Sequence, residues 1–222
     1  MIRKISKDEQ ALINTIKSNL PMAAPYINAQ VDTAIDIAKK YLSDKNRKYD
    51  TGDNIYLHSL RIAVDASKYA NVVSEMPMHR YDLIVIALLH DVIEDADCEE
   101  LRQDLRVFKG NDTIMNGILA LTNDDQKISE IGRSKYMSTK FSALSKGNKD
   151  IFAIKLMDRI DNLACIKLLN MEEKEQALFA SKYLLESLVI YNNLCMNDYI
   201  VPNELFTYYN ELVTMLISEY IY

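Results

Sequence analysis

Apolar side chains recur at intervals of three or four residues along nearly the whole chain, and this spacing constrains its fold most strongly. Such a period gathers apolar groups on one face of an α-helix, whereas a half-buried strand requires alternation at every second residue. No segment shows convincing alternation of that kind. The spacing predicts helices over residues 7–19, 26–43, 55–74, 80–94, 97–108, 111–121, 130–145, 148–170, 172–196 and 203–220.

The segments between these helices are short and rich in residues that begin or end a helix. Examples are "KGND" at 109–112, "TNDDQK" at 122–127 and "SKGNKD" at 145–150. Only 5 glycines and 4 prolines occur in 222 residues, which leaves little material for the turns of an all-β fold. We therefore predict an all-α fold, a multi-helix bundle that forms a single domain over residues 1–222.

Charge and hydropathy exclude several classes of protein. A net charge of −6 argues against general nucleic-acid binding, which needs a basic surface. The longest apolar run, "LIVIALL" at 83–89, is far shorter than the roughly 20 residues that span a bilayer. The N-terminal "MIRKISKDEQ" lacks the apolar core of a secretory signal, and the three cysteines have no C-x-x-C spacing. We expect a cytoplasmic protein without nucleic-acid or membrane partners.

The stretch "ALLHDVIEDAD" at 87–97 runs from an apolar helix into four titratable groups: His90, Asp91, Glu94 and Asp95. On one continuous helix, His90 would lie over Glu94, and Asp91 over Asp95. Burying such groups is costly unless they are paired or bound to a metal. A solvated acidic helix end is the alternative, although negative charge is unfavourable at a helix C-terminus.

Two other predicted helices carry polar residues on apolar faces. His58 shares a face with Ile55 and Ile62, where it is either a hydrogen-bonded core residue or a ligand. In "IFAIKLMDRIDNLACIKLL", Asp158 and Asn162 interrupt an apolar stripe, as buried hydrogen-bonding groups or as functional ones. Lys155, Arg159 and Asp161 of the same helix suit ordinary helix ion pairs, and for Asp161 this is the interpretation we favour.

Together these segments supply two imidazoles and two carboxylates from three predicted helices: His58, His90, Asp91 and Asp158. This set of nitrogen and oxygen donors suits Mn, Fe or Zn, is too rich in nitrogen for Ca or Mg, and leaves positions for water. The basic loop "KNRK" at 45–48 precedes the His58 helix. It is either solvated or a phosphate or base contact beside the site.

The order of a histidine, "HDVIED" and "KLMDRIDN" resembles the HD-domain superfamily of metal-dependent phosphohydrolases. More narrowly, it resembles the hydrolase domain of RelA/SpoT alarmone enzymes and the stand-alone small alarmone hydrolases. "RKYDTG" corresponds to the basic motif of that family, and the match covers about residues 26–170, with C-terminal helices over 171–222. This chain lacks the prolines usual around the first histidine, has two extra residues between Arg47 and His58, and carries Cys165 where the family commonly has Thr.

The resemblance implies that His58, His90, Asp91 and Asp158 bind one Mn²⁺, with Fe, Zn or Co as alternatives. It further implies a catalytic acid/base pair, Glu94 and Asp95, and substrate contacts from Arg47, Lys48, Lys155, Arg159 and Asn162. The implied reaction is hydrolysis of guanosine 3′,5′-bis(diphosphate) and its pentaphosphate to GDP or GTP and pyrophosphate.

Other functions and assemblies stay open at this point. An HD hydrolase could act instead on adenosine alarmones, NADPH or nucleoside monophosphates, and a protein of this kind could bind nucleotide without catalysis. The C-terminal segment carries an apolar stripe: Leu205, Tyr208, Leu212, Met215 and Leu216. The stripe is typical of intramolecular core, and the alternative is a homodimer interface.

Overall fold

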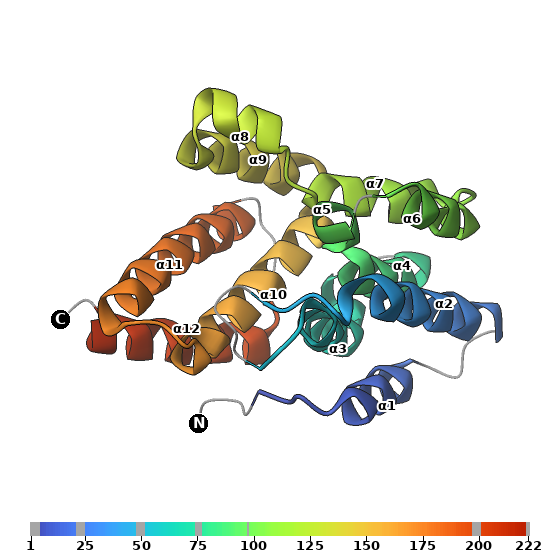
Figure 1. Cartoon of the computed structure of the whole chain (residues 1–222), viewed down its shortest axis with the longest axis horizontal. Coiled ribbons are helices and arrows are strands. Elements are labelled where there is room, and N and C mark those ends of the chain that lie inside the picture. The colour runs from blue at the N-terminus through green and yellow to red at the C-terminus, as the bar shows by residue number, and fades with distance from the viewer. Residues whose placement is uncertain are drawn as a thin grey trace. The chain divides into compact units, whose positions relative to one another are not determined.

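The computed structural model describes residues 5–20, 25–47, 52–73, 77–96, 98–196 and 201–220 (Figure 1). Within these ranges all regular structure is helical, apart from an isolated β-bridge between Asn46 and Asn54. This confirms the predicted all-α class. The chain divides into two compact units. Among the described residues, the N-terminal unit comprises those within 6–47 and 52–123, and the C-terminal unit comprises residue 5 and those from 124 onward.

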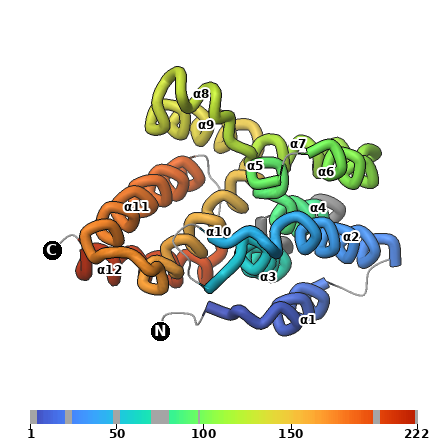
Figure 2. Tube along the Cα trace, viewed as in Figure 1, coloured from blue at the N-terminus to red at the C-terminus, as the bar shows by residue number. Residues whose placement is uncertain are grey.

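The N-terminal unit is organised around α4. Its helices are α1 (Glu9–Asn19), α2 (Pro25–Leu42), α3 (Ile55–Val73), α4 (Pro77–Leu89), α5 (Val92–Ala96), α6 (Glu99–Asp104), the 3-10 helix η1 (Leu105–Phe108) and α7 (Asp112–Leu121). Helix α4 packs against α2, α3 and α7, and every side chain from Leu83 to Leu89 is almost completely buried. Figure 2 shows these helices as the blue to green part of the trace.

The C-terminal unit is organised around α10. Its helices are α8 (Asp125–Ile131), α9 (Arg133–Gly147), α10 (Lys149–Cys165), the 3-10 helix η2 (Ile166–Leu168), α11 (Glu173–Met196) and α12 (Asn203–Tyr220). Helix α10 packs against α9, α11 and α12, and α8 folds back along α9 as a short hairpin (Figure 1). Leu205, Leu212 and Leu216 of α12 are buried, so this stripe serves largely as intramolecular core.

Polar side chains begin several helices at the predicted breaks. Asn111, Asp124 and Asn148 accept hydrogen bonds from backbone N–H groups in the first turns of α7, α8 and α10. Such caps satisfy amide groups that have no partner inside the helix. The sequence prediction nevertheless missed α8, because it assigned "TNDDQK" to a loop, whereas Asp124 begins a helix there. Gly132, with a φ of 82°, separates α8 from α9.

The prediction of one continuous helix over 80–94 is wrong. Helix α4 ends at Leu89 and α5 begins at Val92, so His90 and Asp91 lie in the turn between them. On an uninterrupted helix, neighbouring residues point about 100° apart. The turn instead brings the side chains of His90 and Asp91 into direct contact. Among the residues described above, no helix combines the length and apolar character needed to cross a membrane.

Candidate functional site

His90 is the most buried of the predicted site residues, with 1% of its surface exposed. Its Nδ1 lies 2.9 Å from the carbonyl oxygen of Ala87, one turn back along the chain. A carbonyl oxygen only accepts hydrogen bonds, so Nδ1 must donate, and in the neutral ring Nε2 then carries the lone pair. The backbone of α4 thus fixes the tautomer and orientation that a metal ligand requires.

Asp91 gathers the two histidines around one carboxylate. Its Oδ2 lies 3.0 Å from His90 Nε2 and 3.8 Å from His58 Nε2, and the two imidazole ring centroids are 5.4 Å apart. His58 comes from the first turn of α3, where Asn54 accepts a hydrogen bond from the backbone N–H of Leu57. These three side chains, which we call the His–Asp cluster, all belong to the N-terminal unit.

The His–Asp cluster has the chemistry of a cation site. With Nδ1 protonated, the Nε2 lone pair of His90 faces a carboxylate oxygen at 3.0 Å, and two acceptors at this distance repel each other. Either a proton on the ring or a cation bound to both groups relieves the repulsion. Two imidazole nitrogens and one carboxylate oxygen are donors that Mn, Fe, Co or Zn accept. The residues present therefore fit a divalent transition metal.

Glu94 lies on α5, one turn beyond the cluster, and its carboxylate is held by Asn123. The Asn123 side-chain amide donates to both carboxylate oxygens, at 3.0 and 2.9 Å, and its backbone N–H donates to Oε2 at 3.2 Å. Sequence reasoning missed Asn123, which lies in the polar break after α7. No periodic pattern marks a loop residue whose partner is 29 positions away.

Asp95, the second predicted acid, follows Glu94 on α5 and has a perturbed pKa. Although the residue is exposed overall, the protein around its carboxyl group partly removes water from it. This desolvation, together with repulsion from Asp91 and Glu94, raises the pKa of Asp95 to about 6. A carboxyl group with this pKa exchanges a proton readily near neutral pH.

The basic loop before α3 is anchored by a buried ion pair between Asp53 and Arg61. The Arg61 guanidinium donates to both carboxylate oxygens of Asp53, and both residues are almost fully buried. Asp53 also accepts from the Arg47 guanidinium at 3.4 Å and, through its carbonyl oxygen, from the Arg47 backbone N–H at 3.2 Å. Arg47 is therefore held against Asp53, while Lys48 lies outside the described residues.

Asp158 sits in the middle of α10, 4% exposed, among groups that neutralise its charge. Lys155 Nζ lies 2.7 Å from Oδ2, and an Arg159 guanidinium nitrogen lies 3.7 Å from the same oxygen. Asn162 donates from its side-chain amide to Asp158 Oδ1 at 2.6 Å. The predicted substrate contacts on α10 thus share one carboxylate: Lys155 and Arg159 both pair with Asp158, and Asn162 donates to it.

Arg159 is fixed from a second side by α11. Its Nε lies 3.0 Å from Glu186 Oε2, and its guanidinium carbon lies 4.8 Å from the centroid of the Tyr183 ring. Both partners come from "KYLLESL" on α11, a segment that the sequence prediction left as ordinary helix. On the neighbouring turn of α10, the Cys165 thiol donates to Asp161 Oδ2 at 3.9 Å, so a hydrogen bond persists where the family commonly has Thr.

Apart from Arg47 and Lys48 of the basic loop, the predicted site residues thus form two groups. The N-terminal unit holds His58, His90 and Asp91 in contact, with Glu94 and Asp95 on the next turn. The C-terminal unit holds four residues along α10: Lys155, Asp158, Arg159 and Asn162. The union of the two groups in one site stays a prediction.

Relatives of the chain carry names from alarmone metabolism, although no protein-family profile matches it. It is 25% identical over 159 residues to a probable guanosine-3′,5′-bis(diphosphate) 3′-pyrophosphohydrolase of Mycoplasma pneumoniae, covering 68% of this chain and 20% of that protein. It is 26% identical over 170 residues to a GTP pyrophosphokinase of Streptomyces coelicolor, covering 75% of this chain and 18% of that protein. The chain thus spans about a fifth of the length of these curated relatives.

A solved structure shares the fold. The structure of a metazoan ortholog of SpoT, described as hydrolysing ppGpp, superposes with a TM-score of 0.63 at 18% identity. The match covers 84% of this chain and 95% of that chain. The sequence relatives and this shared fold confirm the predicted resemblance to an HD-type hydrolase domain of the RelA/SpoT kind.

Proposed function

We propose that this chain, which carries an HD-type, RelA/SpoT-like hydrolase domain, is a metal-dependent guanosine 3′,5′-bis(diphosphate) 3′-pyrophosphohydrolase. Water would attack the phosphorus bonded to the 3′-oxygen, the bond between that phosphorus and that oxygen would break, and the 3′-oxygen would receive a proton. The products are GDP or GTP and pyrophosphate. The observation that carries the proposal is the His–Asp cluster, in which His90 Nε2 lies 3.0 Å from Asp91 Oδ2, with two acids on the next turn.

One divalent cation, which we take to be Mn²⁺, would be held by His58, His90, Asp91 and Asp158. When bound, such an ion lowers the pKa of water and neutralises charge on phosphoryl oxygens. His90 is prepared for this role by the hydrogen bond from Nδ1 to the Ala87 carbonyl oxygen. Asp158 would contribute the second carboxylate from α10, as the "KLMDRIDN" motif implies.

Asp95 and Glu94 would divide the proton transfers between them. A pKa near 6 lets Asp95 take a proton from the attacking water or give one up within the neutral range. Glu94, held by three hydrogen bonds from Asn123, would orient the water or protonate the leaving 3′-oxygen.

Local cations would bind the polyphosphate, since the whole chain carries a net charge of −6 and does not attract it. Lys155 and Arg159 on α10, together with Arg47 and Lys48 of the basic loop, are the candidates. Arg47 already lies 3.4 Å from Asp53. Substrate phosphates would therefore compete with that carboxylate for its guanidinium. Asn162 would donate its amide to substrate.

The test is hydrolysis of guanosine tetraphosphate by the purified chain with Mn²⁺, followed by chromatography of the nucleotides. We expect GDP and pyrophosphate in equal amounts, and no turnover after removal of metal with EDTA. Glu94→Gln and Asp95→Asn should each lower kcat by about 100-fold or more, because proton transfer typically contributes 10²–10⁴-fold. The exposed Glu99→Gln and Asp125→Asn are matched controls that should keep full activity.

A panel of other nucleotides tests this proposal against the alternative functions. If the chain hydrolysed an adenosine alarmone, NADPH or a nucleoside monophosphate instead of guanosine tetraphosphate, it would still be a phosphohydrolase, but one with a different substrate. If the chain bound metal but hydrolysed none of these nucleotides, we would reject the catalytic proposal and conclude that the chain is a binding protein. Full activity in both acid variants would reject the roles given to Glu94 and Asp95.

A further inference from the structure

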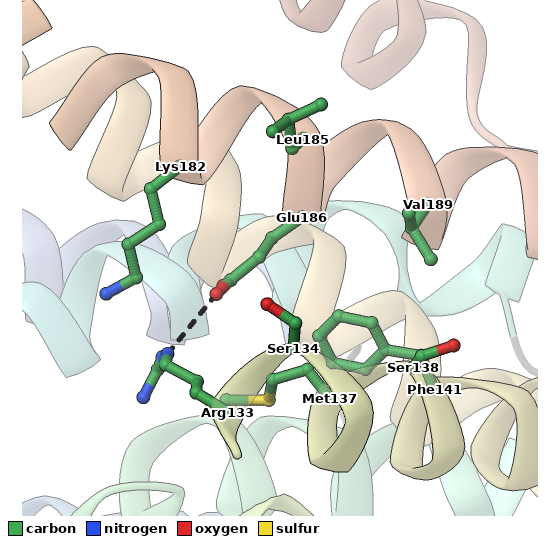
Figure 3. Close-up of a pocket in the computed structure, with 9 residues that line it drawn as sticks. All are labelled: Arg133, Ser134, Met137, Ser138, Phe141, Lys182, Leu185, Glu186 and Val189. Atoms are coloured by element: carbon green, nitrogen blue, oxygen red, sulfur yellow. Dashed lines mark ion pairs between the residues drawn. The ribbon is translucent and has the colours of Figure 1, made fainter. Parts of the chain in front are cut away.

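Helices α9 and α11 of the C-terminal unit enclose a pocket of about 340 Å³ (Figure 3). Its lining includes none of the residues of the His–Asp cluster or of α10 considered above, and Glu186 of the lining pairs with Arg159 of α10. Ligand sites in proteins range from about 300 to 1,000 Å³, so this volume suits a small molecule. Nine residues line the pocket, whereas a stable protein interface uses roughly 20–30 residues on each side. A small ligand is thus a better fit than a protein partner.

One part of the pocket is an apolar wall, formed by Met137 and Phe141 of α9 and by Leu185 and Val189 of α11. Met137 and Phe141 are buried, whereas Leu185 and Val189 are 65% and 40% exposed. Figure 3 shows Leu185 and Val189 on one helix, with Met137 and Phe141 on the helix that faces it. An aliphatic chain lying here would remove exposed apolar surface from water, which is favourable.

The other part is a cationic end formed by Arg133 and Lys182. Figure 3 shows the Arg133 guanidinium directed toward the Glu186 carboxylate. The Lys182 ammonium lies 5.0 Å from the centroid of the Tyr183 ring and 5.8 Å from that of Phe179. Glu186 Oε1 lies 3.5 Å from Arg133 Nε, and its other oxygen lies 3.0 Å from Arg159 Nε on α10. The lining thus contains two cations and a single carboxylate, and that carboxylate is already shared between two arginines. The resulting excess of positive charge favours an anion.

We propose that this pocket binds a small amphipathic monoanion, a carboxylate on a short aliphatic chain. The chain would lie along the apolar wall, and the carboxylate would accept hydrogen bonds at the cationic end. Such charge-assisted hydrogen bonds are stronger than neutral ones, so the head group should contribute strongly to affinity. The proposal does not rest on the proposed hydrolysis, since none of the six wall and end residues belongs to the proposed catalytic, metal-binding or substrate-binding set.

The test is an NMR titration of the full chain with octanoate, followed through the methyl signals of Leu185 and Val189. Two further ligands separate the contribution of the aliphatic chain from that of the carboxylate. 1-Octanol has the aliphatic chain without the charge, and acetate has the charge without the chain. We expect saturable shifts with octanoate, about tenfold weaker binding of octanol, and no saturable binding of acetate. Absence of saturable octanoate binding, or equal affinity for octanoate and octanol, would overturn the proposal.

Variants test whether octanoate binds in this pocket. Leu185→Asp places a carboxylate in the apolar wall and should weaken octanoate binding by about tenfold or more. Leu178→Asp is the matched control: Leu178 is on the same helix, is 66% exposed and does not line the pocket, so binding should be unchanged. Replacing both cations, with Arg133→Gln and Lys182→Gln, should weaken octanoate binding and leave octanol binding unchanged.

A second copy of the chain is the competing occupant of this face. Light scattering on the wild type and on Leu185→Asp distinguishes the two. A dimer that Leu185→Asp dissociates, in a protein that does not bind octanoate, would assign the face to self-association and overturn the proposal. Equal loss of octanoate binding in Leu185→Asp and Leu178→Asp would overturn it as well.

Discussion

Glu94 illustrates how a single loop residue can set the position of a reactive group. Its carboxylate is exposed on α5, and three hydrogen bonds from Asn123 restrict where it can point. A displacement of about 1 Å in a catalytic group can cost about 100-fold in rate. Under the proposed function, Asn123 is a positioning residue that acts through Glu94.

Asn123→Ala should therefore lower kcat for guanosine tetraphosphate by about tenfold or more, with little change in KM and in bound metal. Asn123→Asp should lower kcat further, because a second carboxylate would face Glu94 and repel it. Steady-state kinetics and metal analysis of both variants provide the measurement. Asn14→Ala, at an exposed position on α1, is the control. A change in KM alone would show that Asn123 serves substrate binding instead.

Asp91 is the residue on which metal binding should depend most directly, because it contacts both histidines. Asp91→Ala should abolish bound Mn²⁺ as measured by elemental analysis, whereas Asp44→Ala, at an exposed position, should not. In the wild type, Mn²⁺ at 100 times its dissociation constant should add about 2.7 kcal/mol to the free energy of unfolding. An equal Mn²⁺-dependent rise in melting temperature in Asp91→Ala would contradict the assignment.

At the scale of the residue, the sequence identifies groups that interrupt a pattern. His58 and Asp158 stand out because each is polar on an apolar helical face, and His90 and Asp91 because they end an apolar run. Asn123, Asp53, Arg61 and Glu186 interrupt nothing, since they lie in polar loops or among mixed helical residues. Their importance comes from partners that are distant in sequence, such as Arg159 and Glu186, and only the tertiary structure brings these together.

At the scale of the element, the loop before α3 depends on one buried ion pair. Arg61→Met would leave the Asp53 carboxylate buried without its main partner, which typically costs about 3–5 kcal/mol of stability. The double variant Asp53→Asn with Arg61→Met removes the isolated charge and should recover part of this loss. Urea unfolding of both variants provides the measurement.

Arg106→Met, at an exposed position on η1, is the control and should change stability by less than about 0.5 kcal/mol. If Arg61→Met were no less stable than this control, the ion pair would not anchor the loop. If the double variant were less stable than Arg61→Met alone, the cost would come from lost packing rather than from an isolated charge.

Most helices could be predicted from the sequence because apolar period and capping residues agree. Asn111 and Asn148, for example, lie in predicted breaks and cap the helices that follow. Two details could not be predicted. The turn at His90 and Asp91 falls within an unbroken helical period, and α8 offers no buried residue that would mark an apolar face. In both places local polar contacts, rather than hydrophobic periodicity, decide where the helix begins or ends.

At the scale of the whole molecule, Asp95 couples stability to pH. The pKa of Asp95 is raised to about 6 in the folded state, whereas an aspartate in an unfolded chain has a pKa near 4. Below about pH 4 both states hold the proton, and Asp95 does not penalise folding. Between about pH 4 and 6 the unfolded state loses the proton first. The free energy of unfolding of the metal-free protein should therefore fall as pH rises through this range.

Asp95→Asn should remove this contribution, because an amide does not ionise. The variant should gain stability relative to the metal-free wild type as pH rises from 4 to 7, by about 1 kcal/mol once solvent screening of a partly exposed group is taken into account. Urea unfolding of both proteins at pH 4, 5, 6 and 7 gives the difference, and Asp125→Asn should follow the wild type. A difference that is independent of pH would show that Asp95 titrates normally, and the proton-transfer role proposed for it would lose its physical basis.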